Sequence, residues 1–302
     1  MTPDWIAVDW GTSNLRAWAM GSAGILATAQ SEAGMSKLAR GAFEAALLDL
    51  IAPGLGAGGR VTPVVACGMV GSRQGWHEAP YRAVPCTPLD IAAMTPVPVA
   101  DSRITLRIAP GLKQLRPADV MRGEETQIAG ALAVLTAFDG VFCLPGTHSK
   151  WAHISAGEVV SFQTFMTGEL FALLSGHSVL RHSMPGEGWD DAGFDQGLDE
   201  GCSHPQTLSS GLFTLRAQSL IAGLSPGAAR ARLSGLLIGA ELAAARPYWQ
   251  HRPIALIGAA TLSAIYARAL SRLGQDCQCL DATLCTLSGL ARAQGSLRSA
   301  AE

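Results

Sequence analysis

The sequence predicts an α/β protein with mixed sheets, built from one arrangement of strands that occurs twice. Apolar stretches of strand length alternate with stretches of helix length along the 302 residues, an order typical of sheets covered by helices. A Gly-Thr turn follows an apolar run at Gly11 and again at Gly146. We therefore expect two domains, which would span residues 1–137 and 138–302.

Composition limits the classes of function. The chain is 48% hydrophobic and 15% charged, as expected of a well-packed globular protein. A net charge of -2 gives no basic field, so we expect neither nucleic acid nor a membrane as partner. The seven cysteines are spread along the chain and do not suggest a disulfide framework. Because no secretory signal or spanning segment is evident, the expected location is cytoplasmic.

The first half reads as a hairpin followed by alternating strands and helices. Phe43, Leu47 and Ile51 recur at helical spacing, which predicts one apolar helix face. The segment from Gly68 to Pro98 is polar and has no clear period. The expected elements are, in order, a strand hairpin over Ile6 to Met20, a strand over Ile25 to Ala29, a helix over Leu38 to Ile51, strands over Val61 to Cys67 and Ile104 to Ile108, and a helix over Glu124 to Thr136.

The second half repeats the pattern of the first, beginning at Asp139. When Gly11 is aligned with Gly146, Thr12 meets Thr147, and a third strand over Val159 to Thr164 replaces the one after Gly24. The expected elements that follow are a helix over Thr167 to His177, a loop over Met184 to His204, helices near Phe213 to Ala222 and Pro226 to Ala245, a strand over Pro253 to Gly258, and helices over Ala260 to Leu273 and Leu284 to Ala293.

The first Gly-Thr turn has the residues of a phosphate-binding hairpin. Asp9 ends the preceding strand, where a carboxylate gains nothing from burial unless it is paired or holds a cation such as Mg²⁺. Gly11 lets the backbone approach an oxygen closely. Donors for phosphate oxygens are expected from the next positions and the second strand: Thr12, Ser13, Asn14 and Arg16.

The second turn differs from the first in its charge. Leu144 stands where the first turn has Asp9, and Lys150 adds a cation. This asymmetry predicts that the first loop serves the metal and the second the phosphoryl group of a nucleotide held between two domains. The candidate phosphate-binding residues here are Gly146, Thr147, His148, Ser149 and Lys150. Taken without the repeat, Lys150 could equally be a solvated surface residue.

Three further segments could carry chemistry. Glu124 and Glu125 begin a helix, where acids either complement the helix dipole or supply a general base. Polar and aromatic residues gather between Gly71 and Trp76, and Arg73 could clamp a carboxylate. Small residues after the late strand suit either a bound base and ribose or close helix packing: Gly258, Ala259, Ala260, with Leu262 following. Neither a P-loop nor a dinucleotide fingerprint is present.

Together these segments resemble the superfamily of sugar kinases, actin-like ATPases and heat-shock chaperones, and within it the 2-dehydro-3-deoxygalactonokinase family. The two Gly-Thr loops are superfamily-wide signals, whereas the other segments are specific to the kinase family. The resemblance rests on the segments Asp9 to Arg16, Gly68 to Trp76, Met121 to Gln127, Leu144 to Trp151 and Met166 to Phe171. It implies two duplicated actin-like (ribonuclease H-like) domains with an ATP cleft between them.

The implied reaction is ATP-dependent phosphorylation of the 6-hydroxyl of 2-dehydro-3-deoxy-D-galactonate, with Mg²⁺. A small-molecule sugar acid is then the partner, and a homodimer is left open. Related kinases place an acid two residues before an amide at this helix start, which favours Glu125 over Glu124 as the base because Gln127 follows. The expected substrate-binding residues are Ser72, Arg73, Gln74, Trp76, Arg122 and Glu124.

Two alternatives remain open at this stage. One is a kinase of the same fold that acts on another sugar acid or a polyol. The other is a non-catalytic ATP-driven switch of the actin or chaperone kind, although such a protein has no need of the polar segment from Gly68 to Tyr81.

Overall fold

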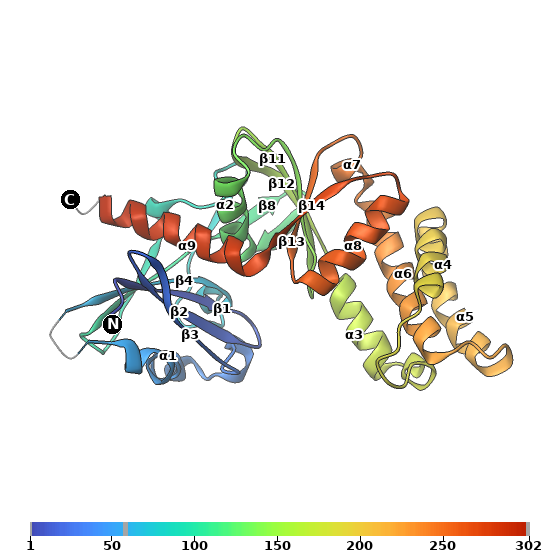
Figure 1. The fold of residues 1–302 in the computed structure, drawn as a ribbon, viewed down its shortest axis with the longest axis horizontal. Coiled ribbons are helices and arrows are strands. Elements are labelled where there is room, and N and C mark those ends of the chain that lie inside the picture. The colour runs from blue at the N-terminus through green and yellow to red at the C-terminus, as the bar shows by residue number, and fades with distance from the viewer. Residues whose placement is uncertain (1, 57–59, 300–302) are drawn as a thin grey trace. The chain divides into compact units, whose positions relative to one another are not determined.

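A computed structural model describes residues 2–56 and 60–299 (Figure 1). Internal contacts divide the chain into two compact units. The first comprises residues up to Phe138, the short segment Ser155–Ser161 and the chain from Ala282 onward. The second comprises Asp139–Ile154 and Phe162–Asp281. The expected division after residue 137 stays a prediction, although the contacts place the last helix with the first unit.

The first unit is built on a six-stranded mixed sheet. Strand β1 pairs antiparallel with β2 and parallel with β4, and β4 pairs parallel with β7. Across the sheet the strands are β3 (Gly24–Ser31), β2 (Leu15–Gly21), β1 (Trp5–Trp10), β4 (Thr62–Gly68), β7 (Ile104–Ile108) and β6 (Thr95–Val97). Because side chains alternate along a strand, β1 sends Ile6 and Val8 to one face and Trp5 and Ala7 to the other.

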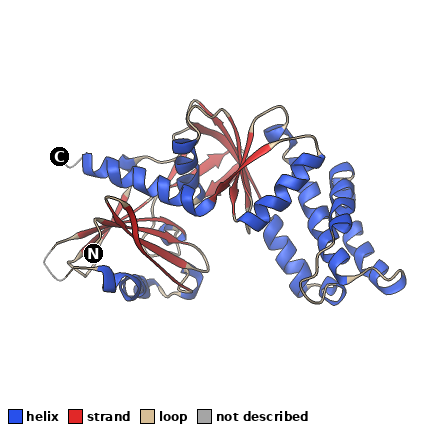
Figure 2. Cartoon of the chain, viewed as in Figure 1, coloured by secondary structure: helices blue, strands red, loops and turns tan. Residues whose placement is uncertain are grey.

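Helices cover both faces of this sheet (Figure 2). The α1 helix (Phe43–Ile51) packs Phe43 and Leu47 against one face. The last helix, α9 (Ala282–Ser299), packs Leu287 and Leu290 against the other. Its outer side lies against α2 (Glu124–Val134). A short three-stranded sheet completes the unit: β5 (Tyr81–Ala83), β8 (Gly111–Leu115) and β9 (Ala118–Met121).

The second unit repeats the strand order of the first. Its strands run β12 (Glu158–Phe165), β11 (Ser149–Ser155), β10 (Gly140–Leu144), β13 (Ile254–Gly258) and β14 (Cys277–Asp281). This order matches β3-β2-β1-β4-β7, and the Gly-Thr loop connects β1 to β2 in the first unit and β10 to β11 in the second. The duplicated α/β arrangement predicted from the sequence is therefore confirmed.

A helical segment follows the β12 strand in the second unit. Its elements are α3 (Thr167–His177), α4 (Asp191–Ser203), α5 (Leu208–Ile221), α6 (Pro226–Ala244) and α7 (Arg246–Trp249), and a further helix, α8 (Ala260–Arg272), follows β13. The predicted loop over Met184 to His204 is wrong for its second part, which forms α4. A Cβ added at Gly197 of α4 would stand 2.2 Å from the Arg232 carbonyl oxygen of α6. Glycine thus permits close packing of two helices here.

Most other predicted elements agree with the structure, with shifted ends. The helix expected to begin at Leu38 begins at Phe43 in the structure, and the closing helix is longer than predicted. The strands β8, β9 and β14 were not predicted. Within residues 2–56 and 60–299 no helix combines the length and apolar character that crossing a membrane requires.

Candidate active site

The first Gly-Thr loop connects β1 to β2 and is fixed by backbone hydrogen bonds. The Gly11 N–H donates to the Asn14 carbonyl over 2.9 Å, and the Ser36 N–H donates to the Thr12 carbonyl over 3.0 Å. Behind the loop, a Cβ at Gly34 would stand 2.1 Å from the Ser13 carbonyl carbon. The loop residues Thr12, Ser13 and Asn14 are exposed. The loop therefore has a fixed backbone and open polar side chains.

Asp9 and Arg16 face each other across β1 and β2 and form an ion pair. Their side chains are 16% and 35% exposed. The Arg16 guanidinium also donates to the Thr283 hydroxyl over 3.2 Å and lies 5.5 Å from the centre of the Trp18 ring. In this conformation Arg16 neutralises the carboxylate that the sequence assigned to a metal.

Two glycines bring the start of α2 close to Asp9. Gly68 ends β4 at φ +91°, and a Cβ there would lie 2.7 Å from the Trp10 carbonyl oxygen and 3.4 Å from Asp9 Oδ1. Gly123 precedes α2 at φ +105°, and its Cβ would lie 3.3 Å from Gly68 Cα. Side chains rarely adopt such angles. The absence of side chains at both positions lets three chain segments converge.

The two glutamates at the start of α2 occupy different environments. Glu124 is partly exposed, and its Oε2 accepts from the Arg122 N–H over 3.1 Å. Glu125 is 0% exposed and accepts from the Gly123 N–H over 2.6 Å and the Thr126 hydroxyl over 2.9 Å. Burial, with the Glu124 charge as a smaller cause, raises the pKa of Glu125 to about 7.

Cys67 links the glutamates to Asp9. Its sulfur lies 3.9 Å from Asp9 Oδ1. Burial first, and then the charges of Asp9 and Glu125, raise the pKa of this thiol well above its usual range. Both carboxylates therefore act on one buried thiol, which places Asp9 and the start of α2 in one neighbourhood. In the described part of the chain, no three acidic, histidine or cysteine side chains form a metal cluster.

The polar segment after β4 splits into exposed and buried residues. Arg73 and Gln74 are exposed. Trp76 is partly buried and packs on Phe43 and Trp10, with ring centres 6.3 and 6.1 Å away. The structure therefore places Trp76 in the core of the first unit, beneath the loop that carries Arg73.

Two of the predicted substrate residues lie beneath that loop. Arg122 is 8% exposed, donates to the Ala79 carbonyl over 2.7 Å and stands 4.2 Å from the Tyr81 ring centre. Ser72 is also buried. The Ser72 hydroxyl and Arg122 Nη1 have no hydrogen-bond partner within residues 2–56 and 60–299. Both residues support the loop from inside the unit.

The second Gly-Thr loop also has an exposed part and a buried part. Gly146, Thr147 and His148 reach the surface, whereas Ser149 and Lys150 are 1% and 4% exposed. The Ser149 hydroxyl is 2.8 Å from that of Tyr266. Both positions of the predicted phosphate set are therefore buried, and Ser149 contacts α8 within the second unit.

The start of α3 closes against this second loop. A Cβ at Gly168 would lie 2.3 Å from the Gly146 carbonyl oxygen, and the Glu169 N–H donates to the Thr147 carbonyl over 2.9 Å. The Glu169 carboxylate also pairs with His148 Nε2 at 2.5 Å. The Met166 to Phe171 segment, singled out in the sequence, thus supports the loop.

The segment after β13 borders a hollow of about 370 Å³ in the second unit. Gly258 and Ala260 line it, while Leu262 packs into the core. Ser263 of α8 also lines it, as do Cys279 and Asp281, which were missed because β14 was not predicted. A Cβ at Gly258 would stand 2.8 Å from Ser263 Oγ, so a side chain there would crowd the hollow.

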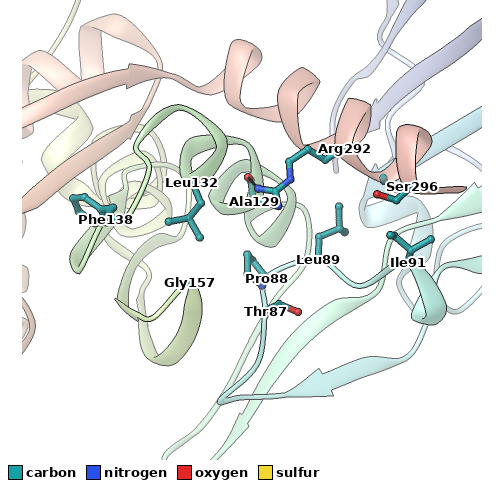
Figure 3. A pocket seen from close by; sticks show the side chains of 12 residues that line it. Thr87, Pro88, Leu89, Ile91, Ala129, Leu132, Phe138, Gly157, Arg292 and Ser296 are labelled. Carbon is teal, nitrogen blue, oxygen red and sulfur yellow. Dashed lines mark hydrogen bonds between the residues drawn. The ribbon is translucent and has the colours of Figure 1, made fainter. Parts of the chain in front are cut away.

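A separate cavity of about 290 Å³ lies in the first unit between α2, α9 and residues 87–91 (Figure 3). Leu132, Phe138 and Arg292 are among its lining residues, and Arg292 donates to the Ala129 carbonyl over 3.3 Å. No residue of the predicted site lines this cavity.

Comparison with known proteins gives a consistent picture. The family model for 2-keto-3-deoxy-galactonokinase matches residues 9–293. A 2-dehydro-3-deoxygalactonokinase from Escherichia coli is 39% identical over 279 residues, which cover 91% of this chain and 92% of that protein. A Sinorhizobium meliloti crystal structure assigned to the same activity is 37% identical at a TM-score of 0.90, covering 97% and 99% of the two chains.

A more distant solved structure shows the fold alone. It is the activator of 2-hydroxyisocaproyl-CoA dehydratase from Clostridium difficile with bound ADPNP, 10% identical at a TM-score of 0.52. The match covers 98% of this chain and 97% of the activator.

Proposed function

The chain belongs to the 2-keto-3-deoxy-galactonokinase family, and we propose that it transfers the γ-phosphoryl group of ATP to the 6-hydroxyl of 2-dehydro-3-deoxy-D-galactonate. It is a phosphotransferase with an alcohol acceptor and has the actin-like fold of sugar kinases. The observation that carries the proposed mechanism is the convergence of Asp9, Gly68 and the start of α2 within one unit.

The two Gly-Thr loops are the proposed sites for the phosphates of ATP. The exposed hydroxyl and amide groups of residues 12–14 and of Thr147 offer donors on fixed backbones. Phosphoryl transfer needs little covalent chemistry from the protein and depends on positioning and charge stabilisation. The ADPNP bound to the dehydratase activator supports the use of ATP by this fold.

Asp9 is the proposed protein ligand of Mg²⁺, directly or through water. Nucleotide-bound Mg²⁺ commonly takes one or two carboxylates together with phosphate oxygens and waters, so the single carboxylate at the end of β1 fits such an ion. When bound, the ion would neutralise charge on the transferring phosphoryl group. Arg16, which now pairs with Asp9, would then be available to a phosphate oxygen.

Glu124 is the proposed general base. A base must reach the hydroxyl proton, so its position is weighed before its pKa. Glu124 is partly exposed, whereas Glu125 is buried with both oxygens engaged. Burial thus favours Glu124 over the sequence-based choice of Glu125. The 6-hydroxyl oxygen bonds to the γ-phosphorus as the bond to the β–γ bridging oxygen breaks, and the hydroxyl proton passes to the Glu124 carboxylate.

The sugar acid is expected to bind above Ser72 and Arg122, against the exposed part of the same loop. Arg73 is the proposed partner of its carboxylate, because a planar guanidinium can bind a carboxylate through two parallel hydrogen bonds. Gln74 lies beside it and is also exposed. The hollow lined by Gly258 and Ala260 is the proposed adenosine site, and Ala259 lies between these two residues in the sequence.

A coupled assay of ADP release tests the proposed substrate. The purified protein would be given MgATP with 2-dehydro-3-deoxy-D-galactonate, its gluconate-derived epimer, other 2-keto-3-deoxy acids and glycerol. We expect the highest kcat/KM for the galactonate-derived acid. A higher kcat/KM for another acid or polyol would reassign the substrate, and ATP hydrolysis without sugar phosphorylation would favour a non-catalytic switch.

A further inference from the structure

A buried carboxylate on α6 connects the elements that surround the second Gly-Thr loop. Glu241 is 3% exposed and lies within the second unit. It accepts hydrogen bonds from Trp151 Nε1 and from the Tyr266 hydroxyl, each over 2.8 Å, and from the Thr167 hydroxyl. These three donors belong to β11, α8 and the first turn of α3. One side chain therefore joins four elements.

Direct and indirect contacts extend from this carboxylate to both ends of the loop. At the exit, Trp151 follows the loop by one residue and binds Glu241 directly. Tyr266 has one hydroxyl proton, which it donates to Glu241, so Ser149 must donate to Tyr266 in turn. The Ser149 proton is thereby used within the protein and is not offered to a phosphate.

At the loop entry the connection runs through α3. Thr167 opens that helix, and Gly168 and Glu169 follow it. These are the residues whose backbone contacts Gly146 and Thr147. Anchoring Thr167 to Glu241 thus fixes the turn of α3 that closes against the exposed half of the loop.

Burying the Glu241 carboxylate has a cost in desolvation free energy. Burial raises the pKa of Glu241, while its hydrogen bonds oppose that rise. A buried carboxylate needs such partners because desolvation of a charge is expensive. An apolar side chain could fill the same space, but it could not hold a tryptophan, a tyrosine and a threonine in one fixed geometry.

We propose that Glu241 is a positioning residue that holds the second Gly-Thr loop, residues 146–150, in the shape that binds the phosphates of ATP. The proposal rests on the assignment of that loop to ATP in the proposed function. Glu241 touches neither nucleotide nor sugar acid. It acts through Ser149, Trp151 and the first turn of α3.

The test compares Glu241→Gln and Tyr266→Phe with a matched control, Glu200→Gln. Glu200 on α4 pairs with Arg232 of α6 over 2.7 Å, so the control removes a polar contact of the same helix that does not reach the loop. Each variant would be assayed for KM of ATP, KM of the sugar acid, melting temperature and MgATP affinity by calorimetry without sugar.

Both test variants should raise the KM and the Kd for ATP, Glu241→Gln by about tenfold or more and Tyr266→Phe by less, with the KM for the sugar acid within about twofold. Glu200→Gln should change the melting temperature alone. Tyr266→Phe keeps the Trp151 and Thr167 contacts and so serves if Glu241→Gln fails to fold.

The proposal is overturned if both test variants bind ATP as tightly as the wild type while losing stability as the control does. A wild-type protein that binds MgATP but phosphorylates no sugar acid would contradict the proposed function instead. The comparison of ATP affinities would still decide the role of Glu241.

Discussion

Glu124 and Glu125 are neighbours in the chain, yet the start of α2 gives them different chemistry. Glu125 turns into the unit and accepts hydrogen bonds from Gly123 and Thr126. Glu124 remains partly exposed. The proposed roles of the two neighbours therefore differ: Glu124 can contact a substrate, whereas Glu125 fixes the turn at the start of α2.

The raised pKa of Glu125 predicts a pH dependence of stability. A carboxyl group whose folded pKa is about 7 instead of 4.5 binds its proton more tightly in the folded protein, so its favourable contribution is lost as the pH rises through this window. We expect the unfolding free energy of the wild type, relative to Glu125→Gln, to fall by about 2–3 kcal/mol between pH 5 and pH 8. Urea unfolding of the wild type and of Glu125→Gln at both pH values measures this difference in unfolding free energy. A difference that does not change with pH would contradict the burial of this carboxyl group.

Replacing Arg73 is expected to weaken binding of the sugar acid without affecting binding of ATP. Arg73→Ala should raise the KM for the acid by about tenfold or more, because a charged hydrogen bond is lost, and should leave the KM for ATP unchanged. Arg60→Ala is the control, since Arg60 is an exposed arginine of the same unit that pairs with Asp4. If Arg73→Ala and Arg60→Ala have the same KM for the sugar acid, Arg73 does not bind the substrate carboxylate.

Sequence reasoning located the loops better than it located individual side chains. The pattern that begins at Gly146 named five consecutive residues, but the last two, Ser149 and Lys150, are buried at the start of β11. Trp76 and Leu262 likewise pack into cores. Glu241 carried no signal in the sequence, because its partners Trp151, Thr167 and Tyr266 meet only in the folded unit.

At the scale of elements, glycine sets how closely helices can approach. A Cβ at Gly130 of α2 would stand 1.8 Å from the Cys285 carbonyl oxygen of α9, and one at Gly289 would stand 2.1 Å from the Thr126 carbonyl oxygen. The two helices therefore cross with backbones in contact. Thr126 follows the two glutamates, so this crossing also fixes the start of α2.

This crossing predicts opposite effects for two alanine substitutions in one helix. Gly289→Ala should destabilise the protein by about 2–3 kcal/mol or more through overpacking against backbone atoms. Gly295→Ala should stabilise it by about 0.5–1 kcal/mol, because nothing lies within 4 Å of a Cβ there. Thermal unfolding of both variants checks this. Similar shifts of the same sign would contradict the close crossing.

The missed elements share a physical reason. The α4 helix contains Gly193, Gly197 and Gly201 at spacing four, and these glycines form a packing face against α6. Glycine has a low intrinsic helix propensity, so this face becomes favourable only when α6 packs on it. The β8 and β9 strands are short and joined by Arg116 and Pro117, so no alternation long enough to predict them exists. Tertiary contacts stabilise these elements where local pattern does not.

For the whole molecule, the repeat at Gly11 and Gly146 predicted the duplicated sheets, because a Gly-Thr turn between two strands is a local pattern that sequence displays directly. The helices that follow the sheets were harder to assign. The α9 helix comes after the strands of the second unit, yet it packs on α2 and on the first sheet. No periodicity within α9 indicates which sheet it will cover.

In the proposed mechanism, the partly exposed acid of α2 activates a sugar-acid hydroxyl while the two Gly-Thr loops hold ATP. The most direct measurement is the turnover of Glu124→Gln and Glu125→Gln with MgATP and 2-dehydro-3-deoxy-D-galactonate, alongside ATP affinity by calorimetry. We expect Glu124→Gln to lose about 10²-fold or more in kcat with ATP affinity nearly intact, and Glu125→Gln to lose much less. Wild-type turnover in Glu124→Gln would contradict the account.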